Sequence, residues 1–460
     1  MDLQHTSFRD PAGQVFRDQK GRVFRQINQA GAEDFDLLLS SGLYDVLTQR
    51  HFMVSHKLVR GETRDKLVGP DAYQLIQPQK IPFVSYPFEW SFSQLRDAAL
   101  LTLRIQLAAL EHGMTLKDAS AYNVQFLDGK PIFIDTLSFE AYHDGTPWQA
   151  YRQFCQHFLA PLSLMAYTDQ NLSQLLRVHL DGIPLDLAAR LLPARARLRM
   201  GVLMHIVWHA RSQRAKASEH KASTVSVRQR NLKAILLDLE HTITKLKPRV
   251  QQTEWADYYH NTNYSSAATD AKAKLIKTML KTIKPKTAVD LGGNNGHYSR
   301  LLSRQKIPVV CTDIDPNAVE ANYRGSKKAK DTNMLPLVVD LTNPGGALGW
   351  QNTEREAVHE RLQTDLVMAL ALVHHLAISN NLPFGMIARY FSQFAPYLII
   401  EFVPKDDSQV QKLLATRKDI FPDYHEDGLE VAFDEYYRLV EKSKIRGTKR
   451  TLYLFKRKAV

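Results

Sequence analysis

The sequence has few of the features that mark secreted or membrane proteins. Only two cysteines occur in 460 residues, Cys155 and Cys311, so neither a disulfide framework nor a cysteine metal cluster is expected. No run of about eighteen uncharged apolar residues is present to span a bilayer. Residues 1–20 are polar and charged, unlike the apolar core of a secretory signal. We therefore expect two reduced core thiols and a cytoplasmic protein without a membrane span.

Positive charge is concentrated in one segment near the middle of the chain. The net charge is +12, and between Arg190 and Lys233 eleven Lys or Arg residues face one acid, Glu219, a net of +10. Residues 211–226 lack apolar periodicity, whereas leucines and isoleucines recur at helical spacing over residues 232–246. A chain of this length exceeds one ordinary core. We predict an N-terminal α+β domain over 1–210, a basic linker and helix over 211–250, and a C-terminal domain over 251–460.

A turn rich in glycine follows directly after a hydrophobic run in TAVDLGGNNGHYSR, residues 287–300. The apolar run ends in Asp290 and is typical of a buried strand, and a helical pattern begins at His297. Three glycines and two asparagines therefore occupy a strand-to-helix turn, where a bare backbone can approach a ligand closely.

Strand and helix patterns alternate through the second half. IPVVCTDIDP ends in Asp313, twenty-three residues after Asp290, and further apolar runs end at Asp340, begin at Asp365 and end at Glu401. In such α/β units a carboxylate at the end of the second strand receives the hydroxyls of a ribose. Two late strands, around EYYRLVE and RTLYLFKRK, indicate an antiparallel hairpin at the sheet edge. The pattern predicts a Rossmann-like sheet with a terminal hairpin.

In these motifs the chain resembles the class I S-adenosylmethionine-dependent methyltransferases, over about residues 255–458. Asn294 stands where that family's acidic-Gly-x-Gly-x-Gly turn has its middle glycine. The resemblance implies that the turn passes the methionine part of the cofactor, that Asp313 binds the ribose and that Asp340 lies near the adenine. The segment WADYYHNTNYSSAA, residues 255–268, is similar to aromatic lead-ins that cover the cofactor. The implied cofactor-binding residues are Asp290, Gly292, Gly293, Asn294, Gly296, Asp313, Ile314, Asp340, Leu341 and Ala369.

Methyl transfer from a sulfonium is an in-line displacement, so the protein mainly aligns the acceptor and removes its proton. His374 and His375, at the end of the fourth strand, are the first candidates for the base, because an imidazole titrates near neutrality. Packing or hydrogen bonding in the core is the other interpretation of either histidine. Glu401 is the next candidate; otherwise it is an acid exposed at a strand end.

The same turn and acid also occur in nicotinamide-dependent dehydrogenases. Their usual turn is G-x-G-x-x-G, and the spacing of Gly292, Asn294 and Gly296 is one residue shorter. The late hairpin also favours the methyltransferase. A Rossmann-like shell with no ligand is the remaining alternative for this half.

The first half has a motif of its own in LKDASAYNVQFLDGKPIFIDTLSFE, residues 116–140. Asp118, Asn123 and Asp135 resemble the catalytic loop and metal-binding segment of protein-kinase-like phosphotransferases, in which an Asn and a later Asp hold magnesium. That resemblance implies Mg-ATP, with Asn123 and Asp135 as metal ligands. The chain departs from the pattern because Arg25 replaces the nucleotide-holding lysine and Thr136 and Leu137 replace Phe and Gly. The resemblance in fold therefore exceeds the resemblance in activity.

The order of motifs along the whole chain also resembles large bacterial methyltransferases described as nodulation-related. The predicted function is methyl transfer to a small-molecule or glycan acceptor, with the first half as lid or substrate receptor. An RNA methyltransferase that uses the basic segment is the second hypothesis, although no RNA-binding module is recognisable. A cofactor-binding scaffold with an inactive kinase-like half is the third.

Overall fold

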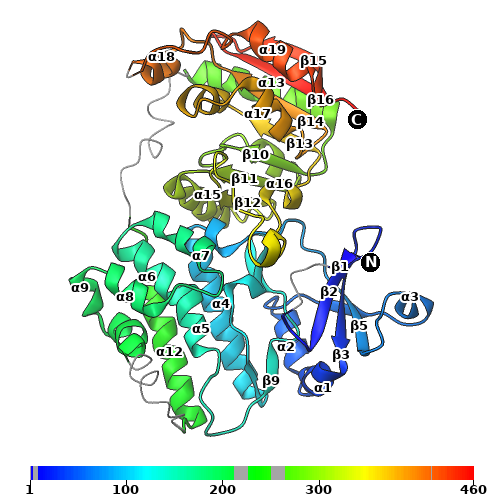
Figure 1. The fold of residues 1–460 in the computed structure, drawn as a ribbon, viewed down its shortest axis with the longest axis vertical. Helices are drawn as coiled ribbons and strands as arrows, with labels where there is room; N and C mark the ends of the chain where they lie inside the picture. The colour runs from blue at the N-terminus through cyan, green and yellow to red at the C-terminus, as the bar shows by residue number, and fades with distance from the viewer. Residues whose placement is uncertain (1, 4–8, 212–225, 250–264, 416, 460) are drawn as a thin grey trace. The chain divides into compact units, whose positions relative to one another are not determined.

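The computed structural model divides the chain into two compact units (Figure 1). The structure describes residues 2–3, 9–211, 226–249, 265–415 and 417–459. The first unit comprises Met1–Arg249 together with Ala347–Arg355, and the second comprises Val250–Gly346 and Glu356–Val460. The segment Ala347–Arg355 thus comes from the second half of the sequence but belongs to the first unit.

The first unit begins with an antiparallel sheet. Its strands follow one another in the order β1-β2-β3-β5-β4. Two small pairs, β6 with β9 and β7 with β8, come later in the chain. The β7–β8 turn holds Asp128 and Gly129 at φ of 51° and 72°, the left-handed pair that a tight hairpin requires. The strands are β1 (Asp2–Leu3), β2 (Gly13–Arg17), β3 (Val23–Asn28), β4 (His56–Leu58), β5 (Ala72–Pro78), β6 (Met114–Leu116), β7 (Val124–Leu127), β8 (Lys130–Phe133) and β9 (Phe139–Ala141).

Helices make up most of the remainder of the first unit. The longest of those before the basic segment, α4, begins at a capping box in which Ser91 and Gln94 each accept a backbone N–H, and most of its apolar residues are buried. The unit is therefore α+β, as predicted. Its helices are α1 (Ala32–Ser40), α2 (Leu43–Gln49), α3 (Glu62–Asp65), α4 (Phe92–Glu111), α5 (Tyr151–Phe154), α6 (Ala160–Tyr167), α7 (Leu175–Val178), α8 (Leu185–Leu191), α9 (Ala194–Arg197), α10 (Met200–Val202) and α12 (Gln229–Lys245).

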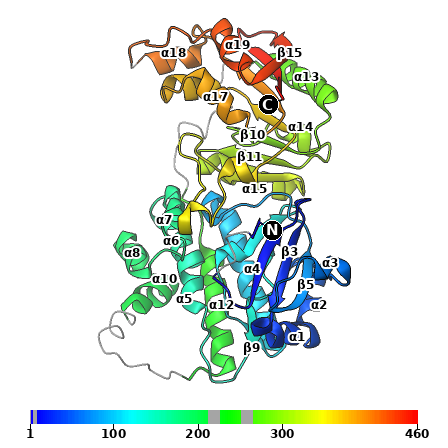
Figure 2. The ribbon, with the colours of Figure 1, turned by 45° about the vertical axis from the view of Figure 1, so that its right-hand side comes forward.

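Helix α12 is the helix predicted after the basic linker. Its buried residues, Leu232, Leu236, Leu239 and Ile243, repeat at helical spacing and face the first unit. Figures 1 and 2 both show α12 alongside α4, against which it packs. The helix is thus part of the first unit's core. The centre of the basic linker, residues 212–225, lies outside the described residues.

The second unit is built on a seven-stranded sheet in the order β12-β11-β10-β13-β14-β16-β15. The first five strands in this order run parallel, and β16 pairs antiparallel with both β14 and β15. The structure therefore confirms the Rossmann-like sheet with a terminal antiparallel hairpin. The strands are β10 (Ala288–Leu291), β11 (Val309–Asp313), β12 (Met334–Val338), β13 (Leu366–Ala369), β14 (Tyr397–Phe402), β15 (Tyr437–Lys444) and β16 (Thr451–Arg457).

Helices cover this sheet and bury its apolar runs. Ile276, Met279 and Leu280 of α13 join strand residues such as Val309 and Met368 in one hydrophobic cluster. Because parallel strands are covered on both faces, their sequences are nearly continuous apolar runs. The helices are α13 (Ser266–Ile283), α14 (Arg300–Ser303), α15 (Pro316–Ala329), α16 (Val358–Arg361), α17 (Phe384–Phe391), α18 (Ser408–Leu414) and α19 (Glu426–Asp434).

Two expectations from composition concern the whole chain. Cys155 and Cys311 are both free and buried, as predicted, and burial raises the pKa of each thiol. None of the helices in the part of the chain that the structure describes has the length and apolar composition needed to span a bilayer.

Candidate functional site

The glycine turn leaves β10 with its backbone in the left-handed region. Gly292 has φ of 71° and Asn294 has φ of 49°, so Asn294 adopts a conformation that asparagine tolerates better than most residues. A Cβ atom on Gly293 would lie 2.6 Å from the Cys311 sulfur, so only glycine fits against β11 there. Glycine is therefore required at Gly292 by the backbone conformation and at Gly293 by the closeness of strand β11.

Asp313, the last residue of β11, holds this turn in place. Its Oδ2 accepts the backbone N–H of Asn294 at 2.8 Å, and its Oδ1 accepts that of Asp315 at 2.9 Å. Burial raises the pKa of the Asp313 carboxyl to about 6, against the opposing effect of these two hydrogen bonds. The carboxylate is ionised at neutral pH and is fixed in orientation by the main chain.

Asp290 lies deeper, near the carboxyl end of β10. Its Oδ2 accepts the hydroxyl of Ser299 at 2.5 Å, whereas its Oδ1 is buried and has no hydrogen-bond partner. Burial raises the pKa of this carboxyl to about 7. A buried carboxylate oxygen without a partner is costly, so the position is suited to a donor that the chain itself does not supply.

These residues surround a cavity of about 450 Å³ in the second unit. It opens at the carboxyl ends of the parallel strands, beside β10, where the order of strands reverses. Nine of the predicted site residues line it: Asp290, Gly292, Gly293, Asn294, Asp313, Ile314, Asp340, Leu341 and His375. Ser266, which also lines the cavity, belongs to the lead-in segment 255–268 predicted to cover the cofactor. The predicted site residues did not include the other lining residues, Thr269, Lys272, Tyr298, Val339, Thr342, Leu370, Ala371, Leu372, Leu376, Ser379 and Asn380.

Four predicted site residues do not line the cavity. Gly296 has φ of 80° and packs against Asn322 of α15, so its role here is in the turn. Ala369 is buried within β13, and the three residues after it line the cavity instead. His374 is buried and packs against the ring of His375. Glu401 is also fully buried.

The two histidines differ in access to the cavity. Their rings lie 4.0 Å apart between centroids, at the start of a π-helical turn over His375–Ser379. Burial lowers the pKa of His375 to about 4 and lowers that of His374 well below its usual value. Both imidazoles are therefore neutral at physiological pH, and His375 is the one that reaches the cavity.

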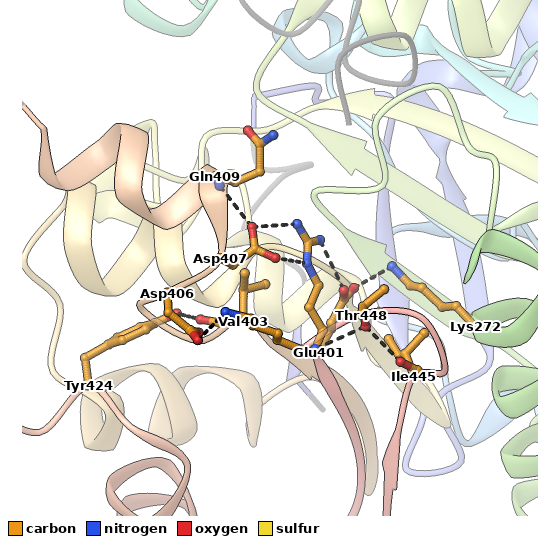
Figure 3. Close-up of polar contacts among 11 residues, drawn as sticks. Lys272, Glu401, Val403, Asp406, Asp407, Gln409, Tyr424, Ile445 and Thr448 are labelled. Atoms are coloured by element: carbon orange, nitrogen blue, oxygen red, sulfur yellow. Dashed lines mark hydrogen bonds and ion pairs between the residues drawn. The ribbon is translucent and has the colours of Figure 1, made fainter. Parts of the chain in front are cut away.

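Glu401 belongs to a buried ion network and is not an acid exposed at a strand end. One of its oxygens pairs with Lys272 of α13, and the other lies 3.3 Å from the Arg450 guanidinium. Arg450 also donates to Asp407 at 2.8 and 3.2 Å, and Asp407 caps α18 at Gln409. Figure 3 shows Glu401 between Lys272 and Asp407. Two cations and two anions thus balance one another inside the protein.

Lys272 is the residue of this network that lines the cavity. It sits on the buried face of α13 with Ile276, four residues further on, and its ammonium lies 4.2 Å from the centre of the Tyr298 ring. A lysine on the apolar face of an amphipathic helix was the signal in the sequence that could have identified it. Its partners could not have been identified in that way.

In the first unit, the two residues predicted to bind magnesium, Asn123 and Asp135, are hydrogen-bonded to a serine of the chain. Asn123 donates to the Ser138 hydroxyl at 3.0 Å, and that hydroxyl donates to Asp135 at 2.6 Å. Within the described residues, no group of three or more His, Cys, Asp or Glu side chains is arranged to hold a metal ion. The aromatic lead-in predicted to cover the cofactor falls mostly on residues 255–264, outside the described residues.

Comparisons with known proteins give one full-length relative. The nodulation protein NoeA of Rhizobium meliloti strain 1021 is 36% identical over 458 residues, which cover 98% of this chain and 95% of that protein. No family model matches the chain.

Similar solved structures cover less of the chain. The bifunctional kinase-methyltransferase WbdD is 15% identical with a TM-score of 0.32, and the match covers 46% of this chain and 45% of WbdD. The N-methyltransferase NodS of Bradyrhizobium japonicum WM9 is 11% identical with a TM-score of 0.32, over 42% of this chain and 99% of NodS. At such low TM-scores these likenesses say nothing about the function of this chain.

Proposed function

The chain belongs to the family of the nodulation protein NoeA, and we propose that it is an S-adenosylmethionine-dependent methyltransferase acting on a small-molecule or glycan acceptor. The observation that carries the proposal is the cavity beside β10, which combines the glycine turn with Asp313 on a sheet of this strand order. Ligands of open α/β sheets bind at the carboxyl ends of the strands, where the strand order reverses. The cavity occupies that position.

The amino-acid end of the cofactor fits the deep side of the cavity. Its ammonium group matches the unpartnered Oδ1 of Asp290, and its carboxylate matches the charge of Lys272. Glu401 and Arg450 hold Lys272 in position through the buried network. A zwitterion therefore finds a carboxyl group and a lysine at the same end of the cavity, and its ammonium group favours the ionised form of Asp290.

The nucleoside end fits the segments after β11 and β12. The Asp313 carboxylate can accept ribose hydroxyls while its oxygens keep their backbone partners, because each oxygen has a second lone pair. Ile314 is 53% exposed and, with Leu341, gives the cavity wall apolar surface for a base. A carboxylate also disfavours a 2′-phosphate, which argues against NADP.

The chemistry supplied by the bound cofactor is an electrophilic methyl group on a sulfonium. Toward it, neutral His375 can accept a proton or a hydrogen bond from the acceptor without adding positive charge. The cavity also includes uncharged polar side chains, Ser266, Thr269, Thr342, Ser379 and Asn380. Such groups suit a neutral hydroxyl-bearing acceptor better than a phosphate, which supports the glycan or small-molecule class.

Calorimetry with the full chain should detect binding of S-adenosylmethionine and of its demethylated product, S-adenosylhomocysteine, without competition by NAD. Asp313→Ala removes an ionised acceptor, so we expect a loss of about tenfold or more, since hydrogen bonds to charged groups contribute about 1.5–3 kcal/mol. Asp423→Ala, at an exposed acid of the same unit, is the matched control and should bind like the wild type. Equal affinities in the two variants would contradict the assignment, and competition by NAD would favour a dehydrogenase.

The role of Lys272 can be separated from that of the nucleoside site. In Lys272→Met, affinity for S-adenosylhomocysteine should fall about tenfold or more, because the charged partner of its carboxylate is lost. Affinity for 5′-methylthioadenosine, which lacks the amino-acid end, should stay within about twofold, a free-energy change of about 0.4 kcal/mol. Lys277→Met, on the exposed side of α13, is the control. An equal loss for both ligands would mean that Lys272 only supports the fold.

A further inference from the structure

Both carboxylate oxygens of Asp135 are occupied by groups of the first unit. Its Oδ1 pairs with the guanidinium of Arg25 and also accepts the backbone N–H of Leu137 at 3.1 Å. Its Oδ2 accepts the Ser138 hydroxyl at 2.6 Å. Burial alone would raise the pKa of Asp135, but the charge of Arg25 and these hydrogen bonds hold it below its usual value. The carboxylate is thus ionised, and its negative charge is balanced by the positive charge of Arg25.

The other polar residues of the kinase-like motif are also engaged. Asn123 donates to Ser138, the same hydroxyl that contacts Asp135. Asp118 accepts the backbone N–H of Ser120 at 2.8 Å, and burial, with the nearby charge of Asp135, raises its pKa. Lys117 pairs with Asp34 of α1 at 3.2 Å. Each group that the resemblance assigned to phosphate transfer therefore has a partner within the protein.

Arg25 is fixed at this position by the sheet. It lies in β3, paired with Val15 of β2 on one side and with Ile76 of β5 on the other. Its side chain and that of Asp135 are only 15% and 14% exposed. A guanidinium is permanently charged and directs several donors in one plane, so it can neutralise and hydrogen-bond a carboxylate without a metal ion.

Apolar packing fills the space beside the pair. Leu137, two residues after Asp135, lies in a cluster with Ala12, Ile27, Phe35 and Ile76. A Cβ atom on Gly13 would lie 2.5 Å from the Leu137 Cδ1, so the start of β2 is in close contact with this side chain. The start of β2 and this apolar cluster therefore pack on Leu137, close to the ion pair in the sequence.

From these contacts we infer that Arg25 takes the place of the divalent metal at Asp135, and that the first unit binds neither magnesium nor Mg-ATP at this motif. Magnesium requires close to six oxygen ligands, usually with a carboxylate oxygen directed at it. In the structure, Oδ1 of Asp135 pairs with Arg25 instead. The residues present therefore do not fit the metal site that the sequence resemblance implies, and the unit is a kinase-shaped scaffold with an internal counter-ion.

Thermal unfolding of the full chain tests this inference. The wild type should melt at the same temperature with and without magnesium chloride, ATP or both, because a ligand that binds the native state must raise the melting temperature. Arg25→Met should melt at a lower temperature, since it leaves a buried carboxylate without its cation, and magnesium alone should partly restore the melting temperature. The double variant Arg25→Met with Asp135→Leu should melt above the single variant and show no response to magnesium.

Arg22→Met is the matched control, because Arg22 forms an exposed pair with Asp18 next to the same strand. It should melt like the wild type in every condition.

A rise in the wild-type melting temperature with Mg-ATP that disappears in Asp135→Asn would overturn the inference. It would also fail if Arg25→Met melted like Arg22→Met and ignored magnesium. Should Arg25→Met not fold, calorimetric titration of the wild type with Mg-ATP decides, because binding lost in Asp135→Asn contradicts the inference and no binding supports it.

Discussion

Replacing Gly292 with valine should lower the affinity for S-adenosylhomocysteine by about 100-fold, measured by calorimetry. A left-handed conformation costs an ordinary residue about 1–2 kcal/mol, and a β-branched residue tolerates it least. A Cβ atom at this position would also lie 2.9 Å from a methyl of Leu372, which lines the same cavity. The turn can relieve the backbone strain and the close contact with Leu372 only by changing its conformation. Binding of the ligand must then restore the original conformation, and the strain and the overpacking together cost about 2–4 kcal/mol.

A matched control separates the loss of the site from general backbone strain. Gly21 has φ of 70°, nearly the same as the 71° of Gly292, but a Cβ atom there would meet no atom within 4 Å. Gly21→Val is therefore strained by a similar amount in the first unit and should bind the ligand like the wild type. Wild-type affinity in Gly292→Val would show that the glycine turn does not form the binding site.

Glu401→Gln should destabilise the second unit by about 3–5 kcal/mol, the usual cost of removing one partner of a buried ion pair. The change keeps the shape of the side chain but removes the charge that pairs with both Lys272 and Arg450, whereas the pair of Arg450 with Asp407 remains. The chain has two units, so a single unfolding free energy is poorly defined. Hydrogen exchange of peptides that cover β14 and β16 should instead report the lower opening free energy.

Glu430→Gln is the control for that experiment. Glu430 pairs with Lys442 at 2.7 Å on the surface of the same unit, where such a pair contributes about 0–1 kcal/mol. Its exchange should stay near that of the wild type. If Glu401→Gln behaved like this control, solvent would be compensating the cations, and the network could not be what holds Lys272 at the cavity.

Much of the second unit could be predicted from local patterns in the sequence. Buried parallel strands require continuous apolar runs, so the strands that end near Asp313 and Glu401 were recognisable from their sequences alone. The glycine turn was recognisable because few other residues adopt its backbone conformation. The resemblance to class I methyltransferases implied that Asp290, Asp313 and Asp340 lie at one cofactor site, and all three line the cavity.

Only the tertiary structure decided which partner each charged side chain has. Lys272 and Glu401 are 129 residues apart, and Arg25 and Asp135 are 110 residues apart. No spacing rule connects residues at such separations, because their contact follows from the order of strands and the packing of helices. For the same reason the sequence offered His374 and His375 as equal candidates, and the fold buried one and directed the other to the cavity. The sequence alone determined the types of element and the turn; side-chain pairing and burial required the complete fold, since a charge can be buried only where a partner meets it.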